Sequence, residues 1–418
     1  MYWINRPRAE DLLAQVLKKP HSSFYRDRYA RAGLDPDTLT VDDFSKLPLL
    51  SRRELTDVPI TARTFTRQEE ICTVAFTSGT SSNMPLSIPF SRIEKYSFEP
   101  SLGCKVSRAL VLLPPIMKAF GTIFIRVCEE AKYKVTPVHG DIKNMANSAF
   151  IAKAAACDSL WALPTIASAF APYAKEQNIA QKFRLIVLSG ETITSARRME
   201  LHSVYPNALI GNVYGSSEFG PILFTCPTMM RSGNNKFHTI PEDFAAIEII
   251  EGELVLSYGL NQASPFVRYR TGDYFDEVPG GCPCGLLGPV IEWSHRSGVD
   301  RLRVNGMAFD VEEADRAFAV FPHVAGKEYQ AHFYPVPGRT AVALKIEIAD
   351  PAASADETRS KELAAFAERE LPAVWKLSAT ATVQTALENG SLASFSVSVV
   401  PTLSESGIKL KRFINHVV

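Results

Sequence analysis

A loop rich in hydroxyl groups follows an apolar run in the segment AFTSGTSSNMPLSIPF, residues 75–90. Between positions 77 and 82 every residue except Gly79 carries a hydroxyl, and glycine permits backbone angles that other residues avoid. Backbone N–H and side-chain O–H donors at this density can surround a ligand with many oxygens, such as a chain of phosphates. Ordinary surface turns are also rich in Ser and Thr, so both interpretations stay open. The hydroxyl loop comprises Thr77, Ser78, Gly79, Thr80, Ser81 and Ser82.

Five further polar segments are spread over most of the chain and mix glycine, hydroxyl and charged residues. They are LSGET (188–192), NVYGSSEFGP (212–221), FVRYRTGD (266–273), RSGVDRLRVNG (296–306) and SESGIKLKR (404–412). No G-K-[ST] follows the hydroxyl loop, which excludes a P-loop kinase.

In order and with similar spacing, these segments resemble the motifs of the adenylate-forming superfamily of acyl-CoA synthetases, most closely its phenylacetate–CoA ligase branch. The likeness extends from about residue 20 to residue 312 and includes HSSFYRDRYARAGLDPDTLTVDDFSKLPLLSRREL near the N-terminus. It implies a reaction in two steps. A carboxylate attacks the α-phosphorus of ATP and releases pyrophosphate, and a thiol then attacks the acyl-adenylate.

The resemblance implies a role for each polar segment. Because two anions must meet, catalysis depends on neutralising charge and aligning the reactants. The hydroxyl loop would hold the β- and γ-phosphates, Tyr214 would stack on adenine, Glu218 would bind Mg²⁺ and Asp273 would accept both ribose hydroxyls. The structural alternatives are that Tyr214 is a core tyrosine, that Glu218 is a carboxylate at a helix N-terminus and that Asp273 is a turn residue. The implied nucleotide-binding residues are Thr77, Ser78, Gly79, Thr80, Ser81, Gly190, Glu191, Tyr214, Gly215, Ser216, Ser217, Asp273 and Arg296, and the implied catalytic residues are Thr80, Glu218 and Lys409.

Three departures from the family pattern concern the loop, the hinge and the tail. Ser82 replaces the loop's second glycine, one residue is inserted and no lysine follows the loop's proline, which predicts a stiffer and less positive loop. The segment from Arg296 to Asp300 holds one extra residue; Arg296 is expected to contact ribose or phosphate, and Asp300 to be the hinge. In the tail, Lys409 is the better candidate for the lysine that contacts the α-phosphate, with Lys411 as the alternative.

A cluster of cysteine and histidine suggests a structural zinc site. Cys282 and Cys284 stand in the turn PGGCPCG, Cys226 follows the YGSSEFGP strand, and His238 comes twelve residues later. Three thiolates and one imidazole suit a closed tetrahedral zinc site, and the phenylacetate branch carries similar residues near these positions. The alternatives are buried reduced thiols or a redox pair. The other four cysteines, Cys72, Cys104, Cys128 and Cys157, are expected to pack in apolar surroundings.

The acid-binding pocket is expected between the first strands of the sheet. Phe120 in PPIMKAFGTIF, Trp161 in WALPTIASAF and Gly215 could line a slot for a flat ring, although Phe120 and Trp161 could equally be core residues. An aromatic monocarboxylic acid is the first choice, mainly because of the family resemblance.

The elements that must position these residues follow from the apolar pattern. Short β-type runs alternate with helical segments between about 70 and 260, which predicts an α/β fold with a mostly parallel sheet and ligands beyond the carboxyl ends of its strands. From about 243, FAAIEIIEGELVLSY predicts a β-hairpin across Glu251-Gly252, and PRAEDLLAQVLKKP predicts a helix near the N-terminus. The C-terminal part predicts strands at LRVNG, VALKIEIA and ATVQTAL, a helix at SKELAAFAEREL and a polar loop at PAASADETRS.

This pattern predicts two domains. Residues 1–296 would form the large N-terminal domain, with a β-rich part at about 243–296, and residues 297–418 a small mobile α+β lid. Lys+Arg and Asp+Glu each number 45 in 418 residues, so no global field favours nucleic acid or an anionic membrane. We find no signal peptide and no apolar stretch long enough to cross a bilayer, and seven scattered cysteines fit a reducing cytoplasm. A homodimer stays open.

These observations predict an ATP- and Mg²⁺-dependent acid–CoA ligase that activates an aromatic or other small carboxylic acid. Another hypothesis is a stand-alone adenylating enzyme that passes the acyl group to an amine, a carrier protein or another acceptor. A third is a nucleotide-binding protein on this scaffold that has lost catalysis.

Overall fold

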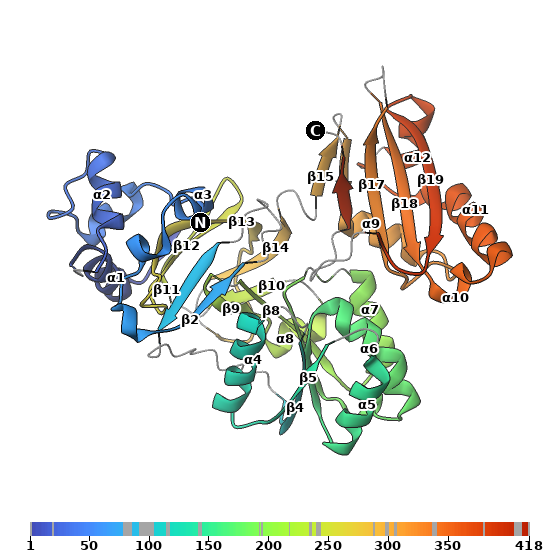
Figure 1. Cartoon of the computed structure of the whole chain (residues 1–418), viewed down its shortest axis with the longest axis horizontal. Coiled ribbons are helices and arrows are strands. Elements are labelled where there is room, and N and C mark those ends of the chain that lie inside the picture. Colours follow the sequence, from blue (N-terminus) through green and yellow to red (C-terminus); the bar gives the residue numbers. More distant parts are fainter. Residues whose placement is uncertain are drawn as a thin grey trace. The chain divides into compact units, whose positions relative to one another are not determined.

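A computed structural model describes most of the chain, which divides into two compact units (Figure 1). The large unit comprises residues 1–190 and 205–294, and the small unit comprises residues 191–204 and 295–418. The helix-forming segment 191–204, predicted within the N-terminal domain, therefore groups with the small unit. The described residues are 2–18, 21–77, 86–91, 104–113, 118–140, 144–191, 193, 195–216, 218–233, 236–239, 244–286, 289–296, 301–304, 307–336, 341–378, 381–404 and 412–416.

The large unit is built on a twelve-stranded sheet whose order is β1-β11-β12-β13-β14-β10-β9-β8-β7-β6-β4-β5. Five neighbouring strands are parallel: β5 (Lys134–His139), β4 (Arg108–Leu113), β6 (Ser159–Ala162), β7 (Leu185–Ser189) and β8 (Leu209–Ser216). Every residue of β6 and β7 is buried, as expected for parallel strands covered on both faces. The helices between them that belong to the large unit are α4 (Lys118–Glu130), α5 (Met145–Ala154) and α6 (Pro164–Glu176). Figure 1 shows α4 on the opposite side of these strands from α5 and α6.

The rest of this sheet forms the β-rich part of the large unit. It contains β9 (Gly220–Phe224), β10 (Lys236–Thr239), β14 (Val290–Arg296), β13 (Phe266–Glu277), β12 (Glu253–Tyr258), β11 (Phe244–Ile250) and β1 (Tyr2–Ile4). The predicted hairpin is confirmed, because β11 and β12 pair antiparallel across Glu251-Gly252. A short helix, α8 (Pro227–Ser232), follows β9. The predicted α/β class is therefore confirmed, with antiparallel strands continuing from the parallel ones.

Helices and short turns follow β1 near the N-terminus and precede the other strands of the sheet in the chain. The predicted first helix is confirmed as α1 (Arg6–Lys18), whose buried face packs into the core with β11 and β12. It is followed by α2 (Phe24–Arg31), α3 (Arg52–Thr56) and a separate antiparallel pair, β2 (Ile71–Phe76) and β3 (Ser87–Ser91). In this region 3-10 turns cover Val41–Lys46, Ile60–Arg63 and Gln68–Glu70, and another, Ala180–Lys182, lies between α6 and β7. None of the helices in the described ranges combines the length and the apolar character needed to span a bilayer.

The small unit contains a four-stranded sheet ordered β19-β18-β17-β20 and a hairpin, β15 (Arg301–Val304) with β16 (Met307–Asp310). The sheet strands are β17 (Tyr329–Pro335), β18 (Val342–Ala349), β19 (Leu392–Val400) and β20 (Phe413–Asn415); the helices are α7 (Ser195–Val204), α9 (Val311–Ala319), α10 (Pro351–Ser354), α11 (Glu357–Val374) and α12 (Val383–Glu388). The expected α+β character is present, and Trp375 and Phe309 are buried in its core.

Two predictions for the small unit were wrong, both because of helix capping. ATVQTAL was expected to be a strand but forms α12, where the Thr382 hydroxyl accepts a hydrogen bond from the N–H of Thr385. PAASADETRS was expected to be a loop, but it contains α10 and the start of α11. Asp350 and Asp356 cap these two helices through their side chains.

Candidate active site

The parallel strands bring two of the polar segments to the same edge of the sheet. β7 ends at Ser189, which pairs with Val213 of β8, so Gly190 and Tyr214 follow at neighbouring carboxyl ends. Gly190 adopts a φ of 85°, in the left-handed region. This is the edge at which α/β folds bind their ligands.

The turn after β8 depends on a glycine. A Cβ atom on Gly215 would lie 2.4 Å from the carbonyl oxygen of Gly220, because β8 and β9 approach closely there. Beyond this point the Ser216 hydroxyl accepts a hydrogen bond of 3.1 Å from the N–H of Glu218. This bond fixes the backbone of the turn at Glu218.

Glu218 is held by an arginine from a distant part of the chain. Arg52 Nη1 donates to Glu218 Oε1 at 2.8 Å, and both side chains are largely buried. Arg52 also donates to the hydroxyl of Thr77, whose backbone pairs with Leu86 across the ends of β2 and β3. One guanidinium thus joins the first residue of the hydroxyl loop to the predicted magnesium ligand.

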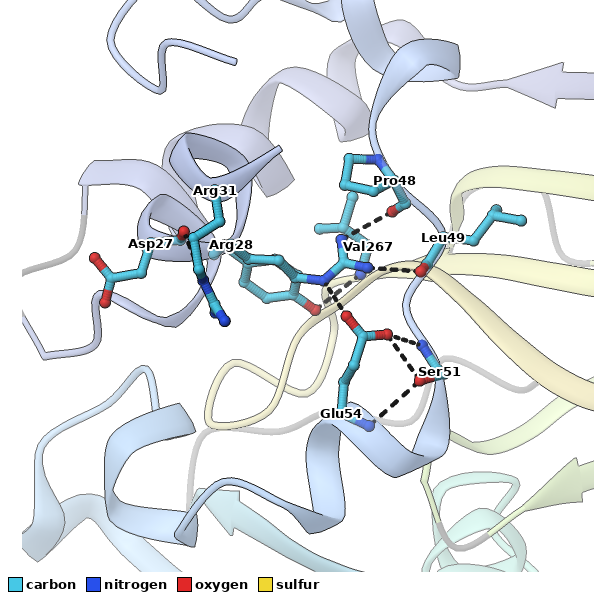
Figure 2. A network of polar contacts seen from close by, with 9 residues as sticks. Asp27, Arg28, Arg31, Pro48, Leu49, Ser51, Glu54 and Val267 are labelled. Carbon is cyan, nitrogen blue, oxygen red and sulfur yellow. Dashed lines mark hydrogen bonds and ion pairs between the residues drawn. The ribbon is translucent and has the colours of Figure 1, made fainter. Parts of the chain in front are cut away.

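The segment that carries Arg52 is itself fixed by a polar network, shown in Figure 2. Arg28 lies on α2 and donates to the carbonyl oxygens of Pro48 and Leu49 at 2.9 and 2.6 Å and to Glu54 at 2.8 Å. The other carboxylate oxygen of Glu54 accepts from the N–H and hydroxyl of Ser51, the cap of α3. Burial raises the pKa of Glu54, but the hydrogen bonds from Arg28 and Ser51 lower it by more, so this pKa lies below its usual value.

A second buried pair lies beside the first. The Tyr214 hydroxyl donates to Asp273 Oδ2 at 2.6 Å, and Asp273 is buried. The Tyr214 ring packs edge-on against Phe275, with centroids 5.1 Å apart, and near Trp293. The partner of the Tyr214 hydroxyl is therefore Asp273, and stacking of the Tyr214 ring on adenine stays a prediction.

Tyr269 lies near enough to both pairs for their charges to act on its hydroxyl. Burial raises the pKa of the Tyr269 hydroxyl far above its usual range, and the charges of Glu218 and Asp273 raise it further against the opposing effect of Arg52. The hydroxyl therefore stays protonated. Glu218, Arg52, Tyr269, Asp273 and Tyr214 form a group that we call the nucleotide site, after the role that the sequence predicts for three of its residues.

The predicted cysteine and histidine residues converge as expected. Their ligand atoms all lie within 4.8 Å of one another, with 3.7 Å between the sulfurs of Cys226 and Cys282 and 3.2 Å between Cys284 Sγ and His238 Nε2. Zinc–sulfur bonds of about 2.3 Å in a tetrahedral site place two sulfurs about 3.8 Å apart. The donor set and its spacing fit zinc. We call these four residues the Cys/His cluster.

Burial sets the protonation of this cluster. It raises the pKa of Cys282 to about 11, an effect to which the neighbouring thiols add, and it lowers the pKa of His238. The imidazole is thus neutral, the form that binds metal, whereas a metal ion must displace the thiol protons. The sulfurs of Cys226 and Cys282 are too far apart for a disulfide bond of about 2.05 Å. Among the other cysteines, Cys128 and Cys157 are buried as expected and Cys104 partly so, but Cys72 is exposed.

Several predicted residues lie elsewhere. Trp161 is fully buried in a core cluster and packs edge-on against Phe124 at 5.7 Å, which favours the core alternative over a pocket wall. Glu191 belongs to the small unit, where its charge acts on Arg412. Outside the described residues lie Ser78, Gly79, Thr80, Ser81, Ser217, Asp300 and Lys409, as do the side chains of Phe120 and Arg296.

Sequence reasoning missed Arg52 and Tyr269. Tyr269 lies inside FVRYRTGD, where the acidic residue drew attention instead. Arg52 stands in SRREL beside Arg53, and nothing in the residue types separates the two. The spacing of Ser51 and Glu54, a capping box, was the available signal that this segment has a defined shape.

Comparison with known proteins finds similarity only at the level of structure. No protein-family model matches the chain, and no curated protein sequence matches it. A solved structure of 2-hydroxyisobutyryl-CoA ligase in complex with 2-HIB-AMP matches over 98% of this chain and 88% of its own, with 15% identity and a TM-score of 0.75. The same ligase with 2-HIB-AMP and CoA matches over 98% and 90%, with 16% identity and a TM-score of 0.60. An anthranilate–CoA ligase in complex with anthranoyl-AMP matches over 82% and 66%, with 16% identity and a TM-score of 0.54.

At these identities the comparison establishes the fold. The chain has the fold of adenylate-forming acyl-CoA ligases, as the sequence motifs led us to expect. The phenylacetate–CoA ligase branch stays a prediction.

Proposed function

We propose that this protein is an ATP- and Mg²⁺-dependent acid–thiol ligase that forms an acyl-adenylate and transfers its acyl group to coenzyme A. The observation that carries the proposal is the pair of buried carboxylates in the nucleotide site. Glu218 is held by Arg52, and Asp273 is held by Tyr214, at the ligand-binding edge of the sheet. Support also comes from the fold, because the solved relatives hold an acyl-AMP.

The nucleotide site offers the charges that adenylation needs. In the first step an oxygen of the acid bonds to the α-phosphorus of ATP, and the bond to pyrophosphate breaks. Glu218 is suited to hold Mg²⁺, which supplies positive charge to the phosphates, and Arg52 adds a fixed positive charge beside it. Asp273 would accept the ribose hydroxyls, and the hydroxyl loop would hold the outer phosphates.

The second step requires a thiol. Its sulfur bonds to the acyl carbon, the bond from that carbon to the AMP oxygen breaks, and the thiol proton leaves to solvent. Coenzyme A is the proposed thiol because one solved relative is a complex with 2-HIB-AMP and CoA. The alternatives are an amine or a carrier protein. We keep Lys409 as the proposed contact to the α-phosphate and Asp300 as the proposed hinge.

The acid is proposed to be a small monocarboxylic acid, with an aromatic acid as the first choice. The relatives named above differ in this respect, since one is a hydroxyisobutyryl ligase and another an anthranilate ligase. With Trp161 in the core, the aromatic preference rests on Phe120 and on the family resemblance.

Exchange of labelled pyrophosphate into ATP tests the proposal, with aryl, arylacetic and short aliphatic acids as substrates. We expect exchange that requires both an acid and Mg²⁺. Mass detection of an acyl-CoA product then identifies the acceptor. Exchange without an acyl-CoA product would indicate a different acceptor, and absence of exchange with every acid would contradict the adenylating activity.

We further propose that the Cys/His cluster binds one structural zinc ion. The closed set of four protein ligands leaves no position for a reacting water, as is usual for structural zinc. The ion would tie the turn after β13 to β10 and to the start of α8. The β13 strand carries Asp273, so the cluster supports the same region of the sheet.

A further inference from the structure

Asp273 is displayed by a bulge in the pairing of β12 with β13. Glu253 pairs with Tyr274 and Val255 pairs with Arg270, so one residue of β12 faces three residues of β13. These three are Thr271, Gly272 and Asp273. Gly272 has a φ of 74°, in the region that favours glycine, and a bulge of this kind turns a side chain away from its regular direction.

One carboxylate holds this bulge in shape. Glu253 Oε1 accepts a hydrogen bond of 2.9 Å from the N–H of Gly272, and its Oε2 accepts one of 2.8 Å from Arg270 Nε. The Glu253 side chain is buried, whereas Arg270 is about half exposed. The Thr271 hydroxyl adds a bond to the Leu254 carbonyl and accepts one from the N–H of Asp273. Glu253 therefore bonds the residue immediately before Asp273.

We propose that Glu253 is a positioning residue that sets the Asp273 carboxylate to recognise the 2′- and 3′-hydroxyls of a bound ribose. The inference rests on the proposed function, since it assumes a nucleotide at Asp273. Glu253 acts on the backbone before Asp273 through the Gly272 N–H, and the Tyr214 hydroxyl donates directly to Asp273 Oδ2. Selectivity for ribose over deoxyribose is therefore a property of the bulge and of Asp273 together.

A matched pair of residues nearby provides the control. Glu248 on β11 is also buried and makes two bonds of 2.9 Å to an arginine of β13, Arg268. Those bonds do not involve the bulge. Glu248→Gln therefore removes the charge of an equivalent buried pair in the same sheet and leaves the surroundings of Asp273 unchanged.

The test is calorimetric titration of the full chain with AMP and with 2′-deoxyAMP. We expect wild type to favour AMP by about tenfold, the value of one hydrogen bond to a charged acceptor. Glu253→Ala should bring this ratio close to one. Glu253→Gln keeps an acceptor for Gly272 but loses the charge facing Arg270, so its ratio should fall to about threefold. Glu248→Gln should keep the wild-type ratio even if its thermal midpoint falls.

The outcomes separate the inference from the proposed function. Glu253→Ala with an unchanged ratio would overturn the inference, because a merely structural residue lowers stability without altering ribose selectivity. If Glu253→Ala does not fold, the same test is made with Glu253→Gln, and an unchanged preference for AMP over 2′-deoxyAMP in that variant would also overturn the inference. Equal affinity of wild type for both nucleotides also overturns the inference but leaves nucleotide binding intact. No binding of AMP by wild type would instead contradict the proposed function.

Discussion

The Cys/His cluster and the nucleotide site differ in how they are held. In the Cys/His cluster, the donor atoms of four residues face one another, so the residues that would bind the ion are also the residues that line the site. In the nucleotide site, each carboxylate already has a partner within the protein, Arg52 for Glu218 and Tyr214 for Asp273.

This difference predicts different responses to change. The thiols and imidazole of the cluster would gain their full stabilisation only with a bound metal ion, so the proposed zinc would couple metal binding to folding. The paired carboxylates are already ordered by their partners within the protein, which would lower the cost of binding the proposed nucleotide. Damage to the cluster should therefore appear as lost stability, and damage to the nucleotide site as lost activity.

The largest effect is expected from a substitution that removes a ligand of the Cys/His cluster. Cys226→Ser should reduce zinc from about one ion per chain to near none and destabilise the protein by on the order of 5 kcal/mol. The thermal midpoint should fall by about 10 °C or more. Metal analysis and differential scanning calorimetry measure both quantities. Cys72→Ser, at an exposed cysteine, should change neither. If the wild-type protein contains no zinc, and a chelator does not lower its thermal midpoint, the proposal that the cluster binds zinc is wrong.

Glu218→Gln should show the opposite pattern. Loss of the carboxylate weakens Mg²⁺ binding, so pyrophosphate exchange should fall by about 100-fold. The zinc content should stay the same, and the midpoint should change by no more than about 3 °C. Near-normal exchange in this variant would show that Glu218 does not bind the metal.

Arg52 tests whether the partner of that carboxylate matters. Arg52→Ala should raise the KM for ATP by about tenfold, because Glu218 and Thr77 lose their shared donor. Arg53→Ala is the matched control, since the Arg53 side chain is 90% exposed. Steady-state kinetics at several ATP concentrations decide between them, and equal effects of the two variants would refute a special role for Arg52.

The smallest expected effect concerns the network in Figure 2. The pKa of Glu54 is lowered in the folded state, so this carboxylate stabilises the fold above its unfolded pKa of about 4.3 and loses that effect as pH falls through the folded pKa. The midpoint of Glu54→Gln should lie below that of wild type near pH 7, and the difference should shrink toward about pH 3. Glu10→Gln, at an exposed glutamate of α1, is the control. A difference that is constant with pH would rule out this role of the charge.

Much of the fold was readable from local patterns. The alternation of apolar runs and helical segments predicted β4 to β8, and Glu251-Gly252 predicted the hairpin, because both signals lie within a few residues. The small unit was harder. The β-branched residues of ATVQTAL suggested a strand, but the capping hydroxyl of Thr382 and the packing of α12 against β19 decided for a helix.

The site was predictable where residue type itself carries the chemistry. Three cysteines and a histidine, or an acidic residue in a recurrent motif, can be recognised without knowing the contacts. Arg52 could not, because its importance depends on a partner 166 residues away. Trp161 could not be assigned either, since a tryptophan in an apolar strand suits a pocket and a core equally, and only burial distinguishes them.

The most direct test of acyl-adenylate formation follows the oxygen atoms of the acid. The reaction is run with ATP, coenzyme A and a carboxylic acid whose carboxyl group carries ¹⁸O, and the nucleotide product is analysed by mass spectrometry. The acid oxygen that attacks the α-phosphorus stays with AMP when the thiol attacks the acyl carbon, so we predict AMP that contains a single ¹⁸O atom. Unlabelled AMP, or ADP as the product, would contradict adenylation at the nucleotide site.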